Sequence, residues 1–70
     1  MHIITINFEP VELFKIIKFE SIVGSGGEAK TRIGEGLVKV NGEVETRKSR
    51  KMVSGDTIEF EKRHYQLALA

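Results

Sequence analysis

Hydrophobic and polar residues alternate along several short segments of this chain and recur at helical spacing along others. Residues 2–8, HIITINF, are rich in β-branched side chains and predict a strand. The period then changes, because Leu13, Ile16 and Ile17 stand at helical spacing. Since a first helical turn tolerates proline, the pattern predicts a helix over residues 9–19.

A second short helix is predicted by a capping signal. Ser25 is followed three residues later by Glu28, the spacing at which each side chain can accept from a backbone N–H at a helix start. Ala29 and Ile33, four residues apart, form the stripe that this helix can bury. Gly36 suits the left-handed conformation that ends many helices. GSGGEA also matches a dinucleotide-binding fingerprint, but no strand precedes it, so a joint before a capped helix is preferred.

The apolar period falls to two after this helix and stays there to the end of the chain. Gly, Asn, Ser and Asp residues separate the alternating segments, as expected for turns between strands. The predicted strands are LVKV, GEVET, DTIEF and YQLAL, at residues 37–40, 42–46, 56–60 and 65–69. We therefore expect an α+β fold in which two short helices pack on a small, mostly antiparallel sheet of four to five strands.

The first hairpin of this sheet has two possible registers. A two-residue turn at Asn41 and Gly42 places Glu43 and Glu45 opposite valines, which makes a poor core. A three-residue loop that starts one position earlier pairs valine with valine instead. The second register is preferred, and in it Lys39 faces Glu43.

Length and composition favour a single domain. Seventy residues suit one compact unit, residues 1–70, with a thin core that takes most of the aromatic side chains. The absence of cysteine excludes disulfides and thiolate metal sites and fits a reducing compartment. No apolar run approaches the ~20 residues that span a bilayer, and the amino terminus lacks the pattern of a secretory signal. We expect a cytoplasmic monomer without a membrane span.

The charges are unevenly distributed although the net charge is only +1. Residues 29–51 contain seven cations and three carboxylates, a balance of +4, and the remainder contains four cations and seven carboxylates, a balance of −3. A domain polarised in this way can present a basic face to a polyanion.

The cations differ in their neighbours. Arg32 has Glu28 four residues before it and Glu35 three after it, so we expect its charge to be paired within the helix. Lys30 has no acidic residue at these spacings, and the cations after the hairpin have only Glu45 nearby. The candidate phosphate-binding residues are Lys30, Arg47, Lys48, Arg50 and Lys51, followed by Lys39 and Lys18.

No pattern of catalysis or metal binding stands out. His2 and His64 lie near opposite ends of the chain without metal-ligand spacing, and the carboxylates stand at distances that suit ion pairs. We therefore expect neither an enzyme, nor a metal site, nor a cofactor. Two hypotheses remain: a module that recognises the phosphates and shape of folded RNA, and a protein-interaction module that docks on an acidic partner. The expected use of phenylalanine in the core leaves little for stacking on unpaired bases.

Residues 11–60 resemble a known family. The segment VELFKIIKFESIVGSGGEAKTRIGEGLVKVNGEVETRKSRKMVSGDTIEF is similar to the alpha-L RNA-binding motif, the S-four type domain of small-subunit ribosomal proteins, pseudouridine synthases and tyrosyl-tRNA synthetases. The shared features are Gly36, VKVNG and SGD. The whole chain resembles the small free-standing bacterial members of the YbcJ type, which carry a preceding strand and the same VETRK segment.

This resemblance implies RNA binding through the second helix and the following hairpin. The implied partners are ribosomal or transfer RNA and, as a further candidate, the ribosome. Many members of the family have Ser-Arg at the start of the second helix, where this chain has Gly26 and Gly27. One phosphate contact typical of the family therefore has no counterpart here.

Overall fold

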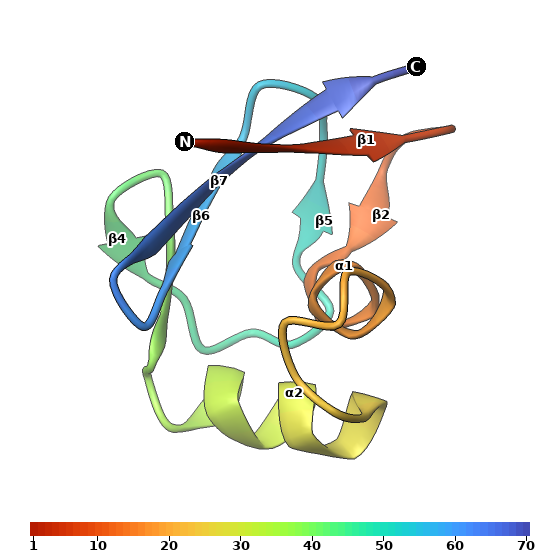
Figure 1. The fold of residues 1–70 in the computed structure, drawn as a ribbon. Coiled ribbons are helices and arrows are strands. Elements are labelled where there is room, and N and C mark those ends of the chain that lie inside the picture. Colours follow the sequence, from red (N-terminus) through yellow and green to blue (C-terminus); the bar gives the residue numbers. More distant parts are fainter.

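The computed structural model describes all 70 residues and contains two helices and two sheets (Figure 1). The elements in chain order are β1 (His2–Ile6), β2 (Val11–Glu12), α1 (Leu13–Phe19), α2 (Gly26–Gly34), β3 (Val38–Val40), β4 (Glu43–Val44), β5 (Lys51–Met52), β6 (Thr57–Phe60) and β7 (Arg63–Leu69). This arrangement confirms the predicted α+β class with two short helices. Neither helix is long and apolar enough to cross a membrane.

The larger sheet has the strand order β1-β7-β6-β3-β4, and a short antiparallel pair, β2 with β5, forms the second sheet. Only β1 and β7 pair in parallel, and they run side by side in Figure 1. The remaining pairs are antiparallel. Glu61 and Lys62, with φ of 52° and 66°, make the two-residue turn between β6 and β7. The sheet is thus mostly antiparallel, as predicted.

One hydrophobic cluster joins the sheet to both helices. Alternate residues of β1, β3, β6 and β7 are buried, as are the predicted stripes of α1 and α2. Its members are Ile4, Ile6, Val11, Leu13, Ile16, Ile17, Val23, Ala29, Ile33, Val38, Val40, Met52, Ile58, Phe60, Tyr65 and Leu67. The two periodicities of the sequence therefore located the core correctly.

The first helix starts later than predicted. It begins at Leu13 instead of near residue 9, because the two preceding residues are extended and pair with β5. No side chain caps this helix. The N–H groups of Leu13 and Phe14 donate instead to the backbone carbonyls of Arg50 and Lys48, at 2.9 and 3.1 Å. A distant segment thus satisfies donors that a helix start leaves unpaired.

The second helix begins and ends as its sequence indicates. The N–H of Glu28 donates to Ser25 Oγ at 3.1 Å, and the Glu28 carboxylate accepts from the N–H of Gly24 at 3.1 Å. Gly36 has φ of 78°, in the left-handed region. The predicted capping box and the glycine after the helix are therefore confirmed.

The preferred hairpin register is wrong. Asn41 and Gly42, with φ of 53° and 86°, form a two-residue turn, so Lys39 pairs with Val44 and not with a glutamate. The argument against this register was that it places carboxylates on the valine face. Glu45 is indeed buried on that side, at 6% exposure. Two arginines, Arg47 and Arg50, neutralise it, and this compensation was not visible in the strand pattern.

The expectation that the core takes most aromatic side chains is also wrong. Phe60 and Tyr65 are buried, whereas Phe14 is only partly buried and Phe8 and Phe19 are each 67% exposed. Phe8 follows the end of β1, and Phe19 is the last residue of α1. Phe8 lies beyond its strand and Phe19 is at the last position of its helix, where the periodicity no longer directs the side chain into the core, so two rings remain at the surface.

Candidate nucleic-acid interface

The connection between β4 and β5, residues 45–50, is named the basic loop here. Its backbone is held in place although it has no regular structure. Its carbonyls at Lys48 and Arg50 accept from the start of α1, and β5, which follows it, pairs with β2. The N–H of Arg50 also donates to the carbonyl of Arg47 at 3.2 Å. The cations of this segment therefore project from a fixed backbone.

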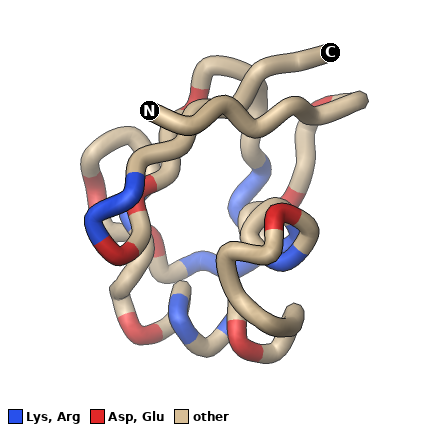
Figure 2. Tube along the Cα trace, viewed as in Figure 1, with Lys and Arg blue, Asp and Glu red and all other residues tan.

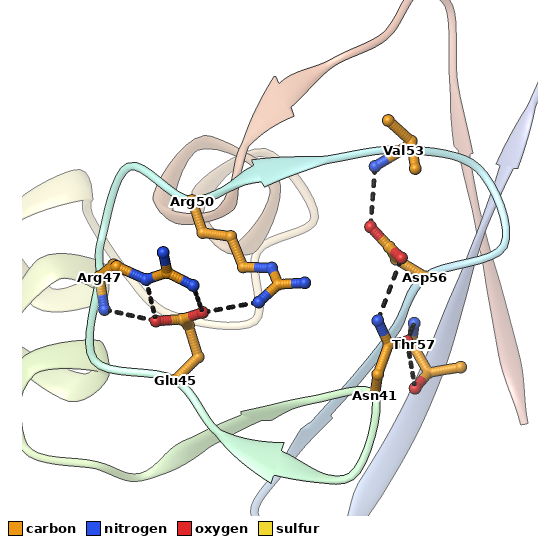
Figure 3. A network of polar contacts seen from close by, with 7 residues as sticks. All are labelled: Asn41, Glu45, Arg47, Arg50, Val53, Asp56 and Thr57. Carbon is orange, nitrogen blue, oxygen red and sulfur yellow. Dashed lines mark hydrogen bonds and ion pairs between the residues drawn. The ribbon is translucent and has the colours of Figure 1, made fainter.

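Glu45 joins two arginines of the basic loop (Figure 3). Its Oε2 accepts from the backbone N–H of Arg47 at 2.9 Å and from Arg47 Nε at 3.0 Å. Its Oε1 accepts from Arg47 Nη2 at 3.0 Å and from Arg50 Nη1 at 2.9 Å. The pairing with Arg47 is bidentate, a geometry that only arginine offers to a carboxylate.

This network fixes the charge state of the buried carboxylate. Hydrogen bonds from Arg47 and then from Arg50 hold the pKa of Glu45 well below its ordinary value, and Glu45 in turn raises the pKa of Arg47. The three side chains together carry one net positive charge. Since the Arg47 side chain is 73% exposed and that of Arg50 is 31% exposed, the carboxylate orients the guanidinium groups without removing them from the surface.

Phe14 connects the basic loop with α2. The backbone N–H of Phe14 donates to the carbonyl of Lys48, and the Nζ of Lys30 lies 4.7 Å from the centre of the Phe14 ring, within cation–π range. Lys30 has no carboxylate within salt-bridge distance. Figure 2 shows the Lys and Arg positions of α2 close to those of the basic loop. The structure thus brings the helix lysine and the loop to one side of the molecule.

Lys51 continues this side of the molecule into β5. It is exposed and stands opposite Glu12 in the β2–β5 pair. Glu12 forms an ion pair with Lys15 at 3.1 Å, and Lys15, followed by Ser49, lowers the pKa of Glu12. Arg47, Ser49, Arg50 and Lys51 line a shallow polar hollow. Three residues of the predicted set, Arg47, Arg50 and Lys51, therefore line one continuous surface.

The two lower-ranked candidates lie elsewhere. Lys39 is on the outer face of the sheet, with Glu59 opposite it in β6. Its two neighbours in β3 are buried, so the Lys39 side chain points away from the core. Lys18 is in the last turn of α1, where its Nζ lies 5.6 Å from the centre of the Phe19 ring and its stem passes close to Gly26. Only Lys18 is near the start of α2.

Arg32 is paired as its sequence neighbours predict. Its guanidinium lies 3.8 Å from the carboxylate of Glu28 and 3.4 Å from that of Glu35. All three side chains are exposed, so these ion pairs contribute little to stability. Arg32 is therefore a suitable control residue: a cation on α2 whose charge is already compensated.

A second polar network was not anticipated. The side-chain amide of Asn41 donates to Asp56 Oδ1 at 3.1 Å, and its carbonyl oxygen accepts from the N–H of Thr57 at 2.9 Å (Figure 3). The other carboxylate oxygen of Asp56 accepts from the N–H of Val53 at 2.9 Å. These contacts join the VNG and SGD segments. Motif residues that suggested a binding family thus hold two turns together.

A protein-family model described as S4 domain matches residues 4–68, nearly the whole chain. The chain therefore belongs to the S4 domain family, as the resemblance of its motifs indicated. This match includes most of β1 and of β7, which lie outside the fifty-residue segment that contains the motifs.

Two relatives and one solved structure are similar to the chain. A protein of Escherichia coli (strain K12) named "Putative RNA-binding protein YbcJ" is 52% identical over 50 residues, 71% of each chain. A protein of Bacillus subtilis (strain 168) named "Probable ribosome maturation protein RlbA" is 38% identical over 58 residues, 83% of this chain and 82% of that one. The solution structure of YbcJ from E. coli, described as revealing an alfaL motif involved in RNA-binding, superposes with a TM-score of 0.73 at 42% identity, covering 97% of this chain and 87% of the other.

Proposed function

We propose that this protein is a non-catalytic module that binds structured RNA of the ribosomal or transfer RNA class through the phosphates of its backbone. The contacts come from the basic loop together with its neighbours on α2 and β5: Lys30, Arg47, Lys48, Arg50 and Lys51. The protein acts as a cytoplasmic monomer, and the ribosome or one of its precursors is the proposed carrier of the RNA. The name of the Bacillus relative supports this last choice.

One observation supports the proposal above others: Phe14 is contacted by the Nζ of Lys30 from α2 and by the backbone carbonyl of Lys48 from the basic loop. A charge run in a mobile segment is usually only solvated. Here the backbone of the run is hydrogen-bonded to α1, and the buried Glu45 orients its two arginines. Cations held at fixed positions lose less conformational entropy when they bind phosphates, which favours affinity.

The primary test is a titration of the intact protein with a folded ribosomal RNA fragment at several salt concentrations. Each phosphate that the protein neutralises contributes roughly −0.7 to −0.9 to the slope of log K against log salt. One contact from each of the five proposed residues predicts a slope of about −3.5 to −4.5. Absence of binding at low salt, or an affinity that salt does not change, would refute the proposal.

Charge-neutralising variants test the position of the interface. Lys30→Gln with Lys48→Gln should reduce the magnitude of the slope by about 1.5 and leave stability unchanged within about 0.5 kcal/mol. Arg32→Gln is the matched control on α2, because its charge is already paired. Lys39→Gln tests the outer sheet face and Lys18→Gln the end of α1. A larger effect from Lys39 than from Lys48 would move the interface to the opposite side of the sheet.

The class of partner is tested in lysate. A tagged protein is captured with and without ribonuclease, and the bound material is examined for RNA and for acidic proteins. Loss of the partner after ribonuclease treatment supports RNA. Retention of an acidic protein after ribonuclease treatment would favour the protein-interaction hypothesis, which salt dependence alone does not distinguish.

A further inference from the structure

Phe8 and Phe19 form an exposed aromatic pair that no part of the proposed phosphate surface uses. Each is 67% exposed, and both line two adjoining hollows. Val11, which is buried, lies in the floor of both. A chain with only four phenylalanines leaves two of them in water at one place. Exposed apolar surface of this kind marks an interaction site more often than it serves folding.

The charges at the aromatic pair differ between its two sides. The hollow toward β1 contains a carboxylate, Glu20, and is otherwise mainly apolar. The hollow toward β5 contains Lys15 and Lys51 together with Glu12, whose charge Lys15 compensates at 3.1 Å. The β5 side therefore carries one net positive charge beside two aromatic rings. Lys18 adds a further cation, 5.6 Å from the centre of the Phe19 ring.

Lys51 makes the aromatic pair continuous with the basic loop. It lines the hollow beside the phenylalanines and also the polar hollow formed by Arg47, Ser49 and Arg50. A nucleic-acid backbone bound at the loop arginines would therefore pass only one further side chain, Lys51, before it reaches the two rings. Phosphate-binding cations followed by exposed rings are the arrangement that proteins use for unpaired nucleotides.

We propose that the aromatic pair binds an unpaired nucleotide next to the structured RNA, with the base stacked on Phe8 and Phe19 and the adjoining phosphate at Lys51 and Lys15. This inference rests on the proposed RNA-binding function. The proposed occupant is single-stranded RNA, because Lys51 lies both beside the rings and in the polar hollow of the basic loop, and the cations beside the rings match the negative charge of an RNA backbone. Every base has a π-face, so stacking here tolerates any base.

The test compares two RNA probes in the same buffer: a blunt stem-loop, and the same stem-loop with a short single-stranded adenosine extension. The extension should increase affinity about tenfold, the effect of stacking one base. Phe19→Leu and Phe8→Leu keep the apolar side chain but remove the ring, and each should abolish most of this gain without changing the affinity for the blunt probe. Ile3→Ala, at another exposed apolar residue outside both hollows, should leave the gain intact.

An NMR titration gives an independent measurement on the folded protein. The aromatic proton signals of Phe8 and Phe19 should shift with the extended probe and stay unchanged with the blunt probe, because only a stacked base produces ring-current shifts at these rings. The signals of the buried Phe60 serve as an internal control.

The outcomes separate this inference from the proposed function. If neither probe binds, the proposed function itself fails. If both probes bind equally, or if the leucine variants weaken both equally, the RNA function stands and the stacking inference is overturned. Capture of a protein that depends on the two rings and survives ribonuclease would overturn it as well, because the pair would then dock a protein.

Discussion

Two polar networks lie within the segment from Asn41 to Thr57, one joining its two ends and the other near its middle, and they differ in what they hold (Figure 3). The Glu45 network joins a buried carboxylate to two guanidinium groups. The Asn41 network joins the Asn41 amide and the Asp56 carboxylate to each other and to the backbone N–H groups of Val53 and Thr57. One network positions charge at the surface, and the other fixes the path of the chain.

In this fold the motif residues are separate from the residues that we propose to bind RNA. The VNG and SGD segments carry much of the family resemblance, yet their side chains bond to each other and to neighbouring backbone. The cations of the basic loop show no such mutual bonding, apart from those that Glu45 orients. We therefore expect changes in the Asn41 network to affect stability alone, and changes in the Glu45 network to affect stability and RNA binding together.

The largest expected effect is that of Glu45→Gln. It removes the only carboxylate between two arginines, one of which has a buried Nε without a hydrogen-bond partner. Breaking a buried ion pair costs about 3–5 kcal/mol, and we expect about 3 kcal/mol because Arg47 remains in water. Urea unfolding monitored by circular dichroism measures the change. A loss below about 0.5 kcal/mol would show that the network contributes nothing to folding.

Acid should weaken the same network by a smaller amount. Because the folded-state pKa of Glu45 is lowered, its contribution to stability is complete above the unfolded pKa of about 4.3 and is lost as the pH falls below that value. As the pH falls below about 5, the free energy of unfolding of the wild-type protein should decline more steeply than that of the Glu45→Gln variant. Parallel pH profiles for the two proteins would contradict this prediction.

Asn41→Ala should have an intermediate effect that is confined to stability. It removes three hydrogen bonds and places alanine at φ of 53°, which costs about 2 kcal/mol in all. Affinity for a folded RNA and its salt slope should stay unchanged, since no cation moves. Measuring both quantities on one preparation tests the separation of the two networks. A change in salt slope would show that the turn and the basic loop are coupled.

The smallest effect on stability is expected for Lys48→Gln. Its side chain is exposed and makes no ion pair, so the free energy of unfolding should change by less than about 0.5 kcal/mol. Its effect on RNA binding should still be measurable, because losing one phosphate contact changes the salt slope by about 0.7 to 0.9. The Glu45 network is thus tested by the free energy of unfolding, and the neighbouring Lys48 by the salt dependence of RNA binding. Equal salt slopes for wild type and variant would exclude Lys48 from the interface.

Sequence reasoning located the cations but misjudged their surroundings at particular residues. It recognised Arg32 as locally paired and Lys30 as free of carboxylates, since both statements depend on helical spacing alone. It paired Lys39 with Glu43 because it chose a three-residue loop at Asn41. That choice assumed that Glu45 could not be buried. A carboxylate on an apolar face looks unfavourable until its partners are known, and those arginines come from a loop that has no periodicity.

The wrong start of α1 and the wrong burial of two phenylalanines have a related cause. The start of α1 is set by the carbonyls of Arg50 and Lys48, which lie more than thirty residues away in sequence. Phe8 and Phe19 read as core residues by their chemistry, and only their positions at element ends leave them exposed. Contacts of this kind carry no local signal.

The sequence by itself determined the class of fold, the core stripes, the capped second helix and the presence of a basic segment, because spacing along the chain encodes each of them. The tertiary structure alone decided where the charges point: it bonds the basic loop to α1, buries Glu45 between two arginines and leaves an aromatic pair beside Lys51. The physical reason is that local geometry governs periodicity and caps, whereas the surroundings of a charge depend on segments that meet only after folding.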